Sequence, residues 1–231
     1  TAPEEVIFKE CFDMACIGEG EGTLIDVADA IEKGKSLYKI KNLWIKKTVK
    51  GKTKIIRNPV RPLIENLDSL PIPYRELFDY KKYLEWNHGT ATFISTRGCP
   101  FNCTYCINNF LIKVYRGKGC YVRFRSIDTL FREIKEVLNK YGQFIKNIEF
   151  YDDTFTLNEE RIKEFCRRYK KEIGLPFNLN ARVNAVNLEI FKSLKEAGCV
   201  RVSMGVECGD DYIRNKILKR NMTDEQIILT F

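Results

Sequence analysis

The stretch "TRGCPFNCTYC", residues 96–106, holds three cysteines, Cys99, Cys103 and Cys106, in the spacing C-x3-C-x2-C. Cys103 and Cys106 are one helical turn apart, so their thiols can reach a single centre. Gly98 stands directly before Cys99 and lets the backbone approach an inorganic group closely. Soft thiolates at such spacing indicate a metal site, and three of them leave one position open for another ligand.

The composition around this stretch is that of a soluble globular protein. The chain has 231 residues, 44% of them apolar and 30% charged, which is enough for one large domain or two small ones. It contains no apolar stretch long enough to span a membrane and no signal-peptide pattern. Because it begins at Thr1 without a methionine and ends at Phe231 inside a predicted helix, we expect it to be a piece of a longer protein.

The nine cysteines are odd in number and unevenly spread, which favours metal binding or catalysis in a reducing cytoplasm over a disulfide framework. The formal net charge is +8, with lysines scattered and paired with glutamates. This charge fits general solubility, and the alternative is an anionic partner such as a nucleic acid or a phosphorylated substrate. No basic stripe with interleaved aromatic residues occurs, so we do not predict nucleic-acid binding.

Downstream of about residue 89 the sequence alternates regularly between strands and helices. Ser126 and Thr223 are predicted helix caps, and Gly142, Gly174 and Gly198 are predicted helix ends. Short strands separated by helices predict parallel strands with right-handed crossovers. Four such units in a row predict an α/β fold that is a barrel or part of one. The predicted strands are residues 90–96, 147–151, 177–183 and 200–206.

One face of three of these strands is polar, although parallel strands covered by helices are normally apolar on both faces. In "FNLNARV", Asn178, Asn180 and Arg182 alternate with apolar residues. Since the helices must cover the apolar face, the polar face predicts a lumen that holds a ligand in a wide, partial barrel. The alternative is a sheet with one solvated face. The equivalent positions on the neighbouring strands are Glu149, Tyr151, Asp153, Arg201, Ser203, Gly205 and Glu207.

Residues 1–33, upstream of the barrel, predict a helix, a strand and a second helix. A short strand at residues 12–17 runs into a glycine-rich turn, and Thr23 caps a helix with Leu24 and Ile31 on its apolar face. A strand, a turn and a helix form one unit of an open α/β sheet, and a single unit cannot bury both of its faces.

The segment between these two regions predicts a hairpin and a linker. Residues 34–60 read as two strands joined at Gly51. The proline-rich "NPVRPLIENLDSLPIPYRELFDY" that follows predicts an extended linker. The predicted domains are therefore residues 1–33, 34–88 and 89–231.

Two kinds of metal centre suit the three thiols of the loop. A structural zinc ion needs four ligands, and here the fourth would be Cys120 or the single histidine, His88. That arrangement would make the chain a zinc-stapled, basic binding module without catalysis. A 4Fe–4S cluster also prefers four cysteines, so a cluster held by three has one open iron, and an open iron is a reaction site.

The sequence "RGCPFNCTYC" resembles the signature loop of the radical S-adenosylmethionine (SAM) superfamily. The resemblance implies a partial barrel in which this loop follows the first strand, with residues 89–231 supplying the first four strand–helix units. It also implies a 4Fe–4S cluster on Cys99, Cys103 and Cys106, whose open iron binds the amino and carboxylate groups of SAM. One electron from the cluster then cleaves SAM to methionine and a 5′-deoxyadenosyl radical.

The resemblance also implies roles for further residues. "EFYDDTFT" matches the segment that contacts the amino end of SAM in the family, with Asp152 and Asp153 in place of a glycine-rich form. "GVECG" resembles "GVES-G", which places Glu207 at the ribose hydroxyls and Cys208 where serine is common. For Asp153 and Arg182 the alternative is a structural ion pair with each other or with Glu149. The implied cofactor-binding residues are Tyr105 on the adenine side, Asp153, Arg182 for the methionyl carboxylate, Ser203 and Glu207.

"FDMACIGEGEGTLIDVADAIEKGK" resembles the last strand and helix of the flavodoxin-like cobalamin-binding domain that precedes many radical SAM barrels. Residues 18–21 match the "GEGE" turn at the ligand-facing edge of that domain. The resemblance implies a cytoplasmic, cobalamin-dependent methyltransferase or cyclase acting on a small molecule, with cobalamin as a further cofactor. An electron donor such as flavodoxin or ferredoxin is implied as a partner. The alternative is a radical SAM enzyme that does not use cobalamin.

Overall fold

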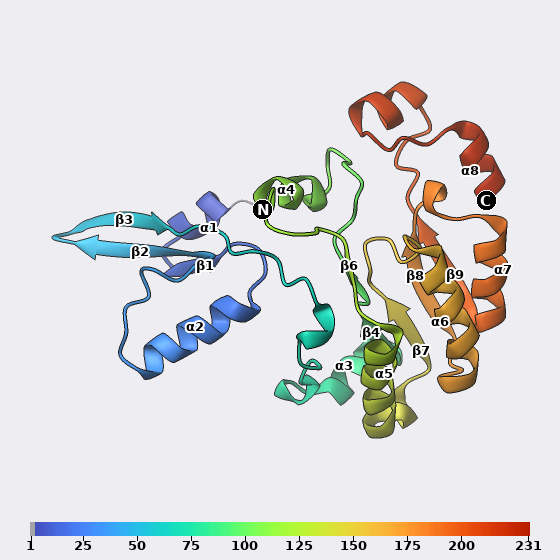
Figure 1. Cartoon of the computed structure of the whole chain (residues 1–231), viewed down its shortest axis with the longest axis horizontal. Helices are drawn as coiled ribbons and strands as arrows, with labels where there is room; N and C mark the ends of the chain where they lie inside the picture. Colours follow the sequence, from blue (N-terminus) through green and yellow to red (C-terminus); the bar gives the residue numbers. More distant parts are fainter. Residues whose placement is uncertain (1–2) are drawn as a thin grey trace. The chain divides into compact units, whose positions relative to one another are not determined.

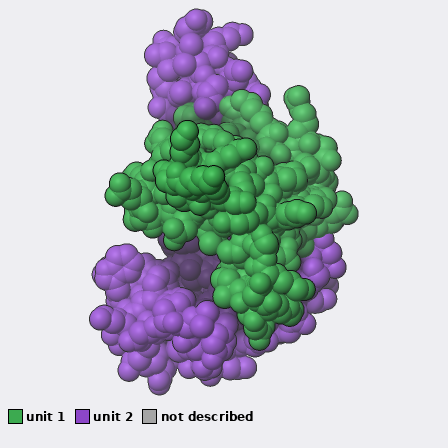
Figure 2. Space-filling model, turned by 90° about the vertical axis from the view of Figure 1, so that its left-hand side faces the viewer, with its two compact units in different colours: residues 1–65, 105–121 green, residues 66–104, 122–231 purple. Residues whose placement is uncertain are grey.

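The computed structural model describes residues 3–231, and the chain divides into two compact units. Unit 1 comprises residues 1–65 and 105–121, and unit 2 comprises residues 66–104 and 122–231 (Figure 2). The cysteine loop crosses this division, since Cys99 and Cys103 belong to unit 2 and Cys106 belongs to unit 1. The domain boundaries at residues 33 and 88 divide the chain differently and stay a prediction.

Unit 2 is built on a four-stranded sheet in the order β4-β7-β8-β9, and every neighbouring pair of strands is parallel (Figure 1). Helices connect successive strands, which confirms the α/β class and the predicted parallel strand–helix units. The elements are β4 (Thr90–Phe93), α5 (Ile127–Tyr141), β7 (Asn147–Phe150), α6 (Glu159–Glu172), β8 (Phe177–Ala181), α7 (Leu188–Ala197), β9 (Cys199–Met204) and α8 (Asp224–Thr230).

The predicted helix ends are confirmed by their caps. The Ser126 hydroxyl accepts a hydrogen bond from the Thr129 amide at the start of α5. Thr223 and Gln226 form a capping box at the start of α8. Gly198 ends α7 at a φ of 106°, in the left-handed region that glycine adopts without strain. Local sequence signals therefore set these helix boundaries.

The two faces of the unit 2 sheet differ as predicted. Helices α5, α6 and α7 cover the apolar face, where Phe150, Phe165, Tyr169 and Phe177 form an aromatic cluster. The ring centroids of Tyr169 and Phe177 are 4.6 Å apart. Burying such rings contributes much of the stability of a core. The opposite face carries a row of polar residues paired from strand to strand, namely Thr92, Glu149, Asn178 and Arg201.

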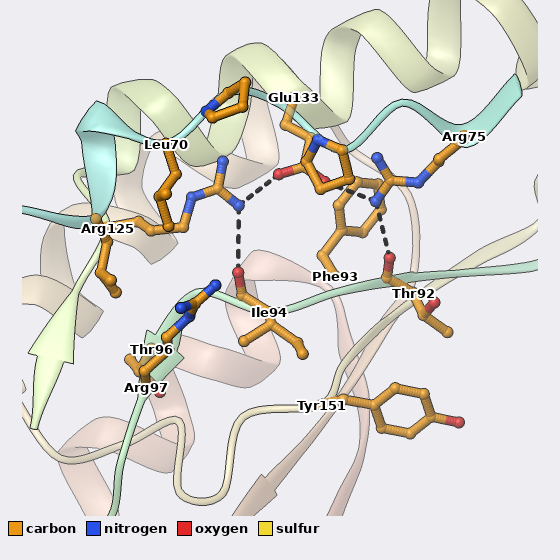
Figure 3. Close-up of a pocket in the computed structure, with 13 residues that line it drawn as sticks. Leu70, Arg75, Thr92, Phe93, Ile94, Thr96, Arg97, Arg125, Glu133 and Tyr151 are labelled. Carbon is orange, nitrogen blue, oxygen red and sulfur yellow. Dashed lines mark hydrogen bonds and ion pairs between the residues drawn. The ribbon is translucent and has the colours of Figure 1, made fainter. Parts of the chain in front are cut away.

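The proline-rich segment, predicted as an extended linker, packs against the rest of unit 2. Asp68 Oδ1 accepts a hydrogen bond of 2.9 Å from the Ser126 amide, and Arg75 Nη2 forms an ion pair of 2.6 Å with Glu133 (Figure 3). These contacts hold the segment against the sheet and α5, so it is part of unit 2 from residue 66 onward. Proline fixes φ and ends helices early, which leaves short turns that still pack. Its elements are η1 (Leu67–Ser69), η2 (Arg75–Leu77) and α3 (Tyr80–Trp86).

Unit 1 contains a three-stranded antiparallel sheet in the order β1-β2-β3. The predicted hairpin is confirmed, and Gly51 in its turn has a φ of 74°. The sequence does not predict that β1 pairs with this hairpin, because it assigns the two to separate domains. The elements are α1 (Pro3–Phe8), β1 (Met14–Cys16), α2 (Glu21–Glu32), β2 (Leu43–Val49), β3 (Lys52–Arg57) and α4 (Ile107–Val114).

Helix α2 differs from its prediction in its start and in the side chains that it buries. It begins directly after Gly20, so Thr23 lies inside the helix and does not cap it. The Thr23 side chain is buried, whereas Leu24 and Ile31, predicted on the buried face, are 71% and 65% exposed. The periodicity that predicts the helix is therefore correct, but the predicted apolar face is not the buried one, since Ala30 is buried while Leu24 and Ile31 are exposed.

The remaining elements are short connections. Strands β5 and β6 form a two-stranded antiparallel ribbon beside the start of the cysteine loop. Among residues 3–231, no helix combines the length and the apolar character that crossing a membrane requires. These connections are β5 (Thr96–Arg97), β6 (Arg123–Phe124), η3 (Gly142–Phe144), η4 (Val183–Ala185) and the π-helical turn η5 (Tyr212–Ile217).

Candidate functional site

The cysteine loop begins where β4 ends, and the buried carboxylate of Asp152 fixes that point. Asp152 is 1% exposed and accepts hydrogen bonds from Ser95 N at 3.0 Å, Ser95 Oγ at 2.9 Å and Thr96 Oγ1 at 2.5 Å. Burial raises the pKa of the Asp152 carboxyl, and these donors oppose the rise. Gly98 then takes a φ of 87°, which turns the chain toward Cys99. Asp152 therefore positions the residues that lead into the loop.

Cys99 is the first thiol of the loop and is buried. Its Sγ lies 3.7 Å from Thr154 Oγ1, on the segment that follows β7. Burial raises the pKa of the Cys99 thiol, and the Asp153 carboxylate acts in the same direction. Coordination to a metal would reverse this preference for the neutral thiol, because a metal binds the thiolate.

Cys103 is 4% exposed and receives hydrogen bonds from two buried guanidinium groups. Arg182 Nη1 donates to Cys103 Sγ at 2.9 Å, and Arg220 Nη1 donates to the same sulfur at 3.6 Å. Arg182 also lies over the Phe101 ring, 3.9 Å from its centroid. Two cationic donors at one sulfur suit a ligand of a sulfur-rich anionic group.

Arg220 also connects Cys103 to the loop that follows β9. Its Nη2 donates to the Gly205 carbonyl, and its own carbonyl accepts a hydrogen bond from Arg182. Thr104 forms two hydrogen bonds with carbonyls of the segment that carries Arg220, at 2.8 Å and 3.2 Å. Asp152 therefore holds the start of the cysteine loop, and the segment after β9 holds the loop at Cys103 and Thr104.

Cys106 stands at the start of α4 in unit 1. The buried Asn108 donates from Nδ2 to Cys106 Sγ at 3.6 Å. The Tyr121 hydroxyl donates to Asn108 Oδ1 at 2.6 Å, which orients the amide. Tyr105, which the resemblance places on the adenine side, has an exposed side chain. The sulfur of Cys106 thus has a neutral donor, whereas that of Cys103 has charged ones.

The other predicted cofactor-binding residues lie at or beyond the carboxyl ends of β7, β8 and β9. Arg182 is buried, whereas Asp153, Ser203 and Glu207 are exposed. Glu207 has a φ of 73°, and its Oε1 lies so close to Gly205 that a Cβ added there would be 2.3 Å away. Among residues 3–231, only Arg182 of these four donates a hydrogen bond to a cysteine of the loop.

The alternative ion pair between Arg182 and Asp153 or Glu149 does not form within the described part of the chain. Glu149 pairs instead with Arg201, whose Nη2 is 2.8 Å from Glu149 Oε1. Arg182 donates to Cys103, to a backbone carbonyl and to a neutral amide oxygen. Its positive charge therefore has no carboxylate partner among residues 3–231.

The sequence does not predict that three residues, Asp152, Arg220 and Asn108, hold the loop. Asp152 had a visible signal, because its position two residues after Phe150 continues the buried face of β7. A carboxylate in such a position must find hydrogen-bond partners. Arg220 and Asn108 give no comparable signal, since their contacts depend on how irregular segments fold.

The donor chemistry of the three thiols fits a 4Fe–4S cluster. All three are free of disulfide bonds, and each sulfur has a hydrogen-bonding neighbour. Hydrogen bonds to sulfur are one way in which proteins tune iron–sulfur clusters. Among residues 3–231, no group of three or more His, Cys, Asp or Glu side chains is assembled around a metal position.

The glycine-rich turn after β1 is held, within unit 1, by the segment that follows Cys106. The Glu19 amide donates to the Tyr115 hydroxyl at 2.5 Å, and Asn42 Nδ2 donates to the Glu19 carbonyl at 3.0 Å. Gly18 has a φ of 84°, and a Cβ added there would overlap the Tyr115 ring. Only glycine therefore fits at this position, and α4 packs with the turn.

Known proteins resemble this chain over nearly all of its length. It is 34% identical over 232 residues to an uncharacterised methyltransferase of Pyrococcus horikoshii, covering 99% of this chain and 48% of that protein. It is 23% identical to the anaerobic magnesium-protoporphyrin IX monomethyl ester cyclase of Rubrivivax gelatinosus, covering 95% of this chain and 39% of the cyclase. The chain therefore spans about half the length, or less, of these relatives.

A solved structure has the same fold. The cobalamin-dependent S-adenosylmethionine radical enzyme OxsB, solved with aqua-cobalamin and SAM bound, superposes with a TM-score of 0.77 and 22% sequence identity. The match covers 98% of this chain and 32% of OxsB. The family model of the radical SAM superfamily matches residues 93–231, which is more than half of the sequence and includes all three cysteines of the loop. The chain belongs to the radical SAM superfamily.

Proposed function

We propose that this chain carries the core of an enzyme that cleaves SAM reductively at a 4Fe–4S cluster, the cofactors of its superfamily. The observation that carries the proposal is the surroundings of Cys103. This buried thiol of the signature loop accepts hydrogen bonds from Arg182 and Arg220. Charged donors at a ligand sulfur offset the negative charge of a cluster held by thiolates.

Cys99, Cys103 and Cys106 would hold the cluster. When bound, the cluster supplies one electron and an iron with an open position for SAM. The residues of the chain hold and orient the ligands. Asp152 fixes the first end of the loop through Ser95, and the segment carrying Arg220 fixes the loop at Cys103.

Residues at the carboxyl ends of the strands are proposed to bind SAM. Arg182 is buried, cationic and without a carboxylate partner among residues 3–231, so it suits the methionyl carboxylate. Exposed carboxylates at Asp153 and Glu207 suit the amino group and the ribose hydroxyls. Ser203 on the polar face and Tyr105 on the adenine side complete the proposed set.

Cobalamin is proposed as a further cofactor, in a methyltransferase or cyclase that acts on a small molecule. The support is that OxsB binds cobalamin and that the P. horikoshii relative is named a methyltransferase and the R. gelatinosus relative a cyclase. The packed glycine-rich turn of unit 1 resembles the ligand-facing edge of a cobalamin-binding domain. We further propose a cytoplasmic location, because the nine cysteines are odd in number and unevenly spread, and an electron donor such as flavodoxin or ferredoxin.

The experiment is anaerobic reconstitution of the chain with iron and sulfide, followed by electron paramagnetic resonance with and without SAM. A reducible cluster whose spectrum changes on addition of SAM, and formation of methionine after reduction, would support the proposal. One zinc ion per chain and no reducible cluster would contradict it.

The variant Arg182→Gln tests the proposed contact with the methionyl carboxylate. It also removes one of the two charged donors to Cys103, but Arg220 still donates to that sulfur, so we expect the cluster to form. The variant should need at least about tenfold more SAM for the same spectral change, the loss typical of one charge-assisted hydrogen bond. Arg201→Gln, on the same polar face but paired with Glu149, is the matched control and should behave as the unchanged chain.

A further inference from the structure

Arg220 is the second cationic residue at the cysteine loop, and none of the proposed contacts with SAM involves it. It is 6% exposed and lies in the segment between η5 and α8. Its Nη1 donates to Cys103 Sγ at 3.6 Å, and its Nη2 donates to the Gly205 carbonyl after β9. Because the donors of a guanidinium group lie in one fixed plane, these two contacts together set the orientation of the group.

The π-helical turn η5 holds the backbone of Arg220 in place. The Arg220 amide donates to the Arg214 carbonyl at 2.9 Å. The Arg214 side chain is 1% exposed and donates to the Met222 carbonyl at 3.2 Å. It also donates to the Cys208 and Gly209 carbonyls, at 3.2 Å and 3.0 Å. Residues on both sides of Arg220 are therefore tied to the loop after β9, so its position beside the loop sulfur is preorganised.

A buried positive charge at a ligand sulfur affects the charge state of a bound cluster. Reduction adds one negative charge to a 4Fe–4S cluster, and hydrogen bonds to the sulfurs help to set its reduction potential. A guanidinium group carries a fixed positive charge. Because Arg220 and Cys103 are both buried, solvent screens this charge weakly. The charge therefore stabilises the reduced cluster more than the oxidised one.

We propose that Arg220 is a positioning residue that raises the reduction potential of the 4Fe–4S cluster through Cys103. The inference rests on the proposed function, because it requires the cluster. It gives the two arginines at this sulfur different roles. Arg182 is proposed to bind the methionyl carboxylate of SAM, whereas Arg220 makes the cluster easier to reduce. The electron comes from the proposed flavodoxin or ferredoxin, which is oxidised as the cluster is reduced.

Redox titration of the reconstituted chain without SAM, followed by electron paramagnetic resonance, tests the proposal. Arg220→Gln should lower the equilibrium constant for one-electron reduction about tenfold, which lowers the midpoint potential by about 59 mV. Arg220→Lys keeps the positive charge and should restore most of the potential. Lys219→Gln is the matched control, because it removes the same charge one residue away at an exposed side chain. Solvent screens that charge, so the potential should stay unchanged.

Four results would overturn the proposal. The first is an unchanged potential in Arg220→Gln, and the second is an equal decrease in Lys219→Gln. The third is a potential in Arg220→Lys as low as in Arg220→Gln, because the charge would then not be the cause. The fourth is loss of the cluster in Arg220→Gln, which would show that the residue holds the loop rather than tunes the cluster.

The outcome also distinguishes this inference from the proposed function. If the unchanged chain forms no reducible cluster, both are contradicted. If Arg220→Gln forms a cluster with an unchanged potential, and the unchanged chain cleaves SAM, only the role of Arg220 is contradicted.

Discussion

The two units differ in how they bury apolar surface. In unit 2, three helices cover the apolar face of the sheet, and Phe150, Phe165 and Phe177 are fully buried. In unit 1, α2 leaves Leu24 and Ile25 mostly exposed. The fold of unit 2 is therefore held by its own core, whereas hydrophobic burial contributes little to holding α2.

The cysteine loop shows the same contrast on a smaller scale. Cys103 in unit 2 is buried against two guanidinium groups, while Cys106 in unit 1 has one neutral amide donor. The two thiols of one motif are therefore held by different chemistry. Substitutions in each unit can test whether unit 2 depends more on buried contacts than unit 1 does.

The largest effect is expected in the core of unit 2. Phe165→Ala removes a fully buried ring and leaves a cavity, so it should reduce the free energy of unfolding by about 3–5 kcal/mol. Leu24→Ala in α2 should change it by less than about 0.5 kcal/mol, because that side chain is already in solvent. Urea unfolding of both variants measures the difference. Similar losses of unfolding free energy in the two variants would show that the two units do not differ in how they bury apolar surface.

A smaller loss is expected at the start of the cysteine loop. Asp152→Ala leaves the Ser95 amide and the Thr96 hydroxyl buried without their acceptor, which should cost about 2–3 kcal/mol of unfolding free energy. The neighbouring Asp153→Ala, at an exposed carboxylate, is the control and should cost less than about 0.5 kcal/mol. If the two variants unfold at the same urea concentration, Asp152 does not position the loop.

In unit 1 the expected effect is that of a single hydrogen bond. Tyr115→Phe removes the acceptor of the Glu19 amide, so hydrogen exchange at that amide should become about fivefold faster, corresponding to about 1 kcal/mol. Tyr121→Phe removes a different hydrogen bond, to Asn108, and should leave exchange at Glu19 unchanged. An unchanged rate in Tyr115→Phe would show that the glycine-rich turn is held by other contacts.

The smallest effect depends on pH and concerns the outer surface of unit 2. Arg168 and Lys135 lower the pKa of Glu172 from 4.5 to about 2. A carboxyl with a lowered pKa stabilises the fold above its unfolded pKa, and this contribution decreases as the pH falls from about 4.5 to about 2.

Glu172→Gln tests this contribution. Since the side chain is 28% exposed, solvent screening limits the loss to about 0.5–1 kcal/mol at pH 7, and it should be smaller at pH 3. Thermal unfolding of the variant and the unchanged chain at both pH values measures it. A loss that is the same at pH 7 and pH 3 would contradict the ion-pair explanation.

Much of unit 2 was predictable because its signals are local. Strand alternation, the cap residues Ser126 and Thr223, and the glycine at the end of α7 depend only on neighbouring residues, and the structure confirms them. The polar face of β8 was predictable for the same reason, because side chains alternate along a strand.

The features that sequence did not predict depend on contacts between distant residues. The proline-rich segment packs through Arg75, 58 residues from Glu133, and Arg220 reaches Cys103 across 117 residues. The apolar pattern of α2 predicts a helix, but it contains no information about which element covers that helix. The pairing of β1 with β2 likewise depends on contacts between residues far apart in the sequence, such as Met14 and Ile45.

The most direct test of the central claim is the iron content of the reconstituted chain in two cysteine variants. We expect Cys106→Ala to lose the 4Fe–4S cluster and its electron paramagnetic resonance signal, because three thiols hold the cluster. Cys120→Ala, at an exposed thiol outside the loop, should retain both at the level of the unchanged chain. Loss of the cluster in Cys120→Ala, or its retention in Cys106→Ala, would contradict the account.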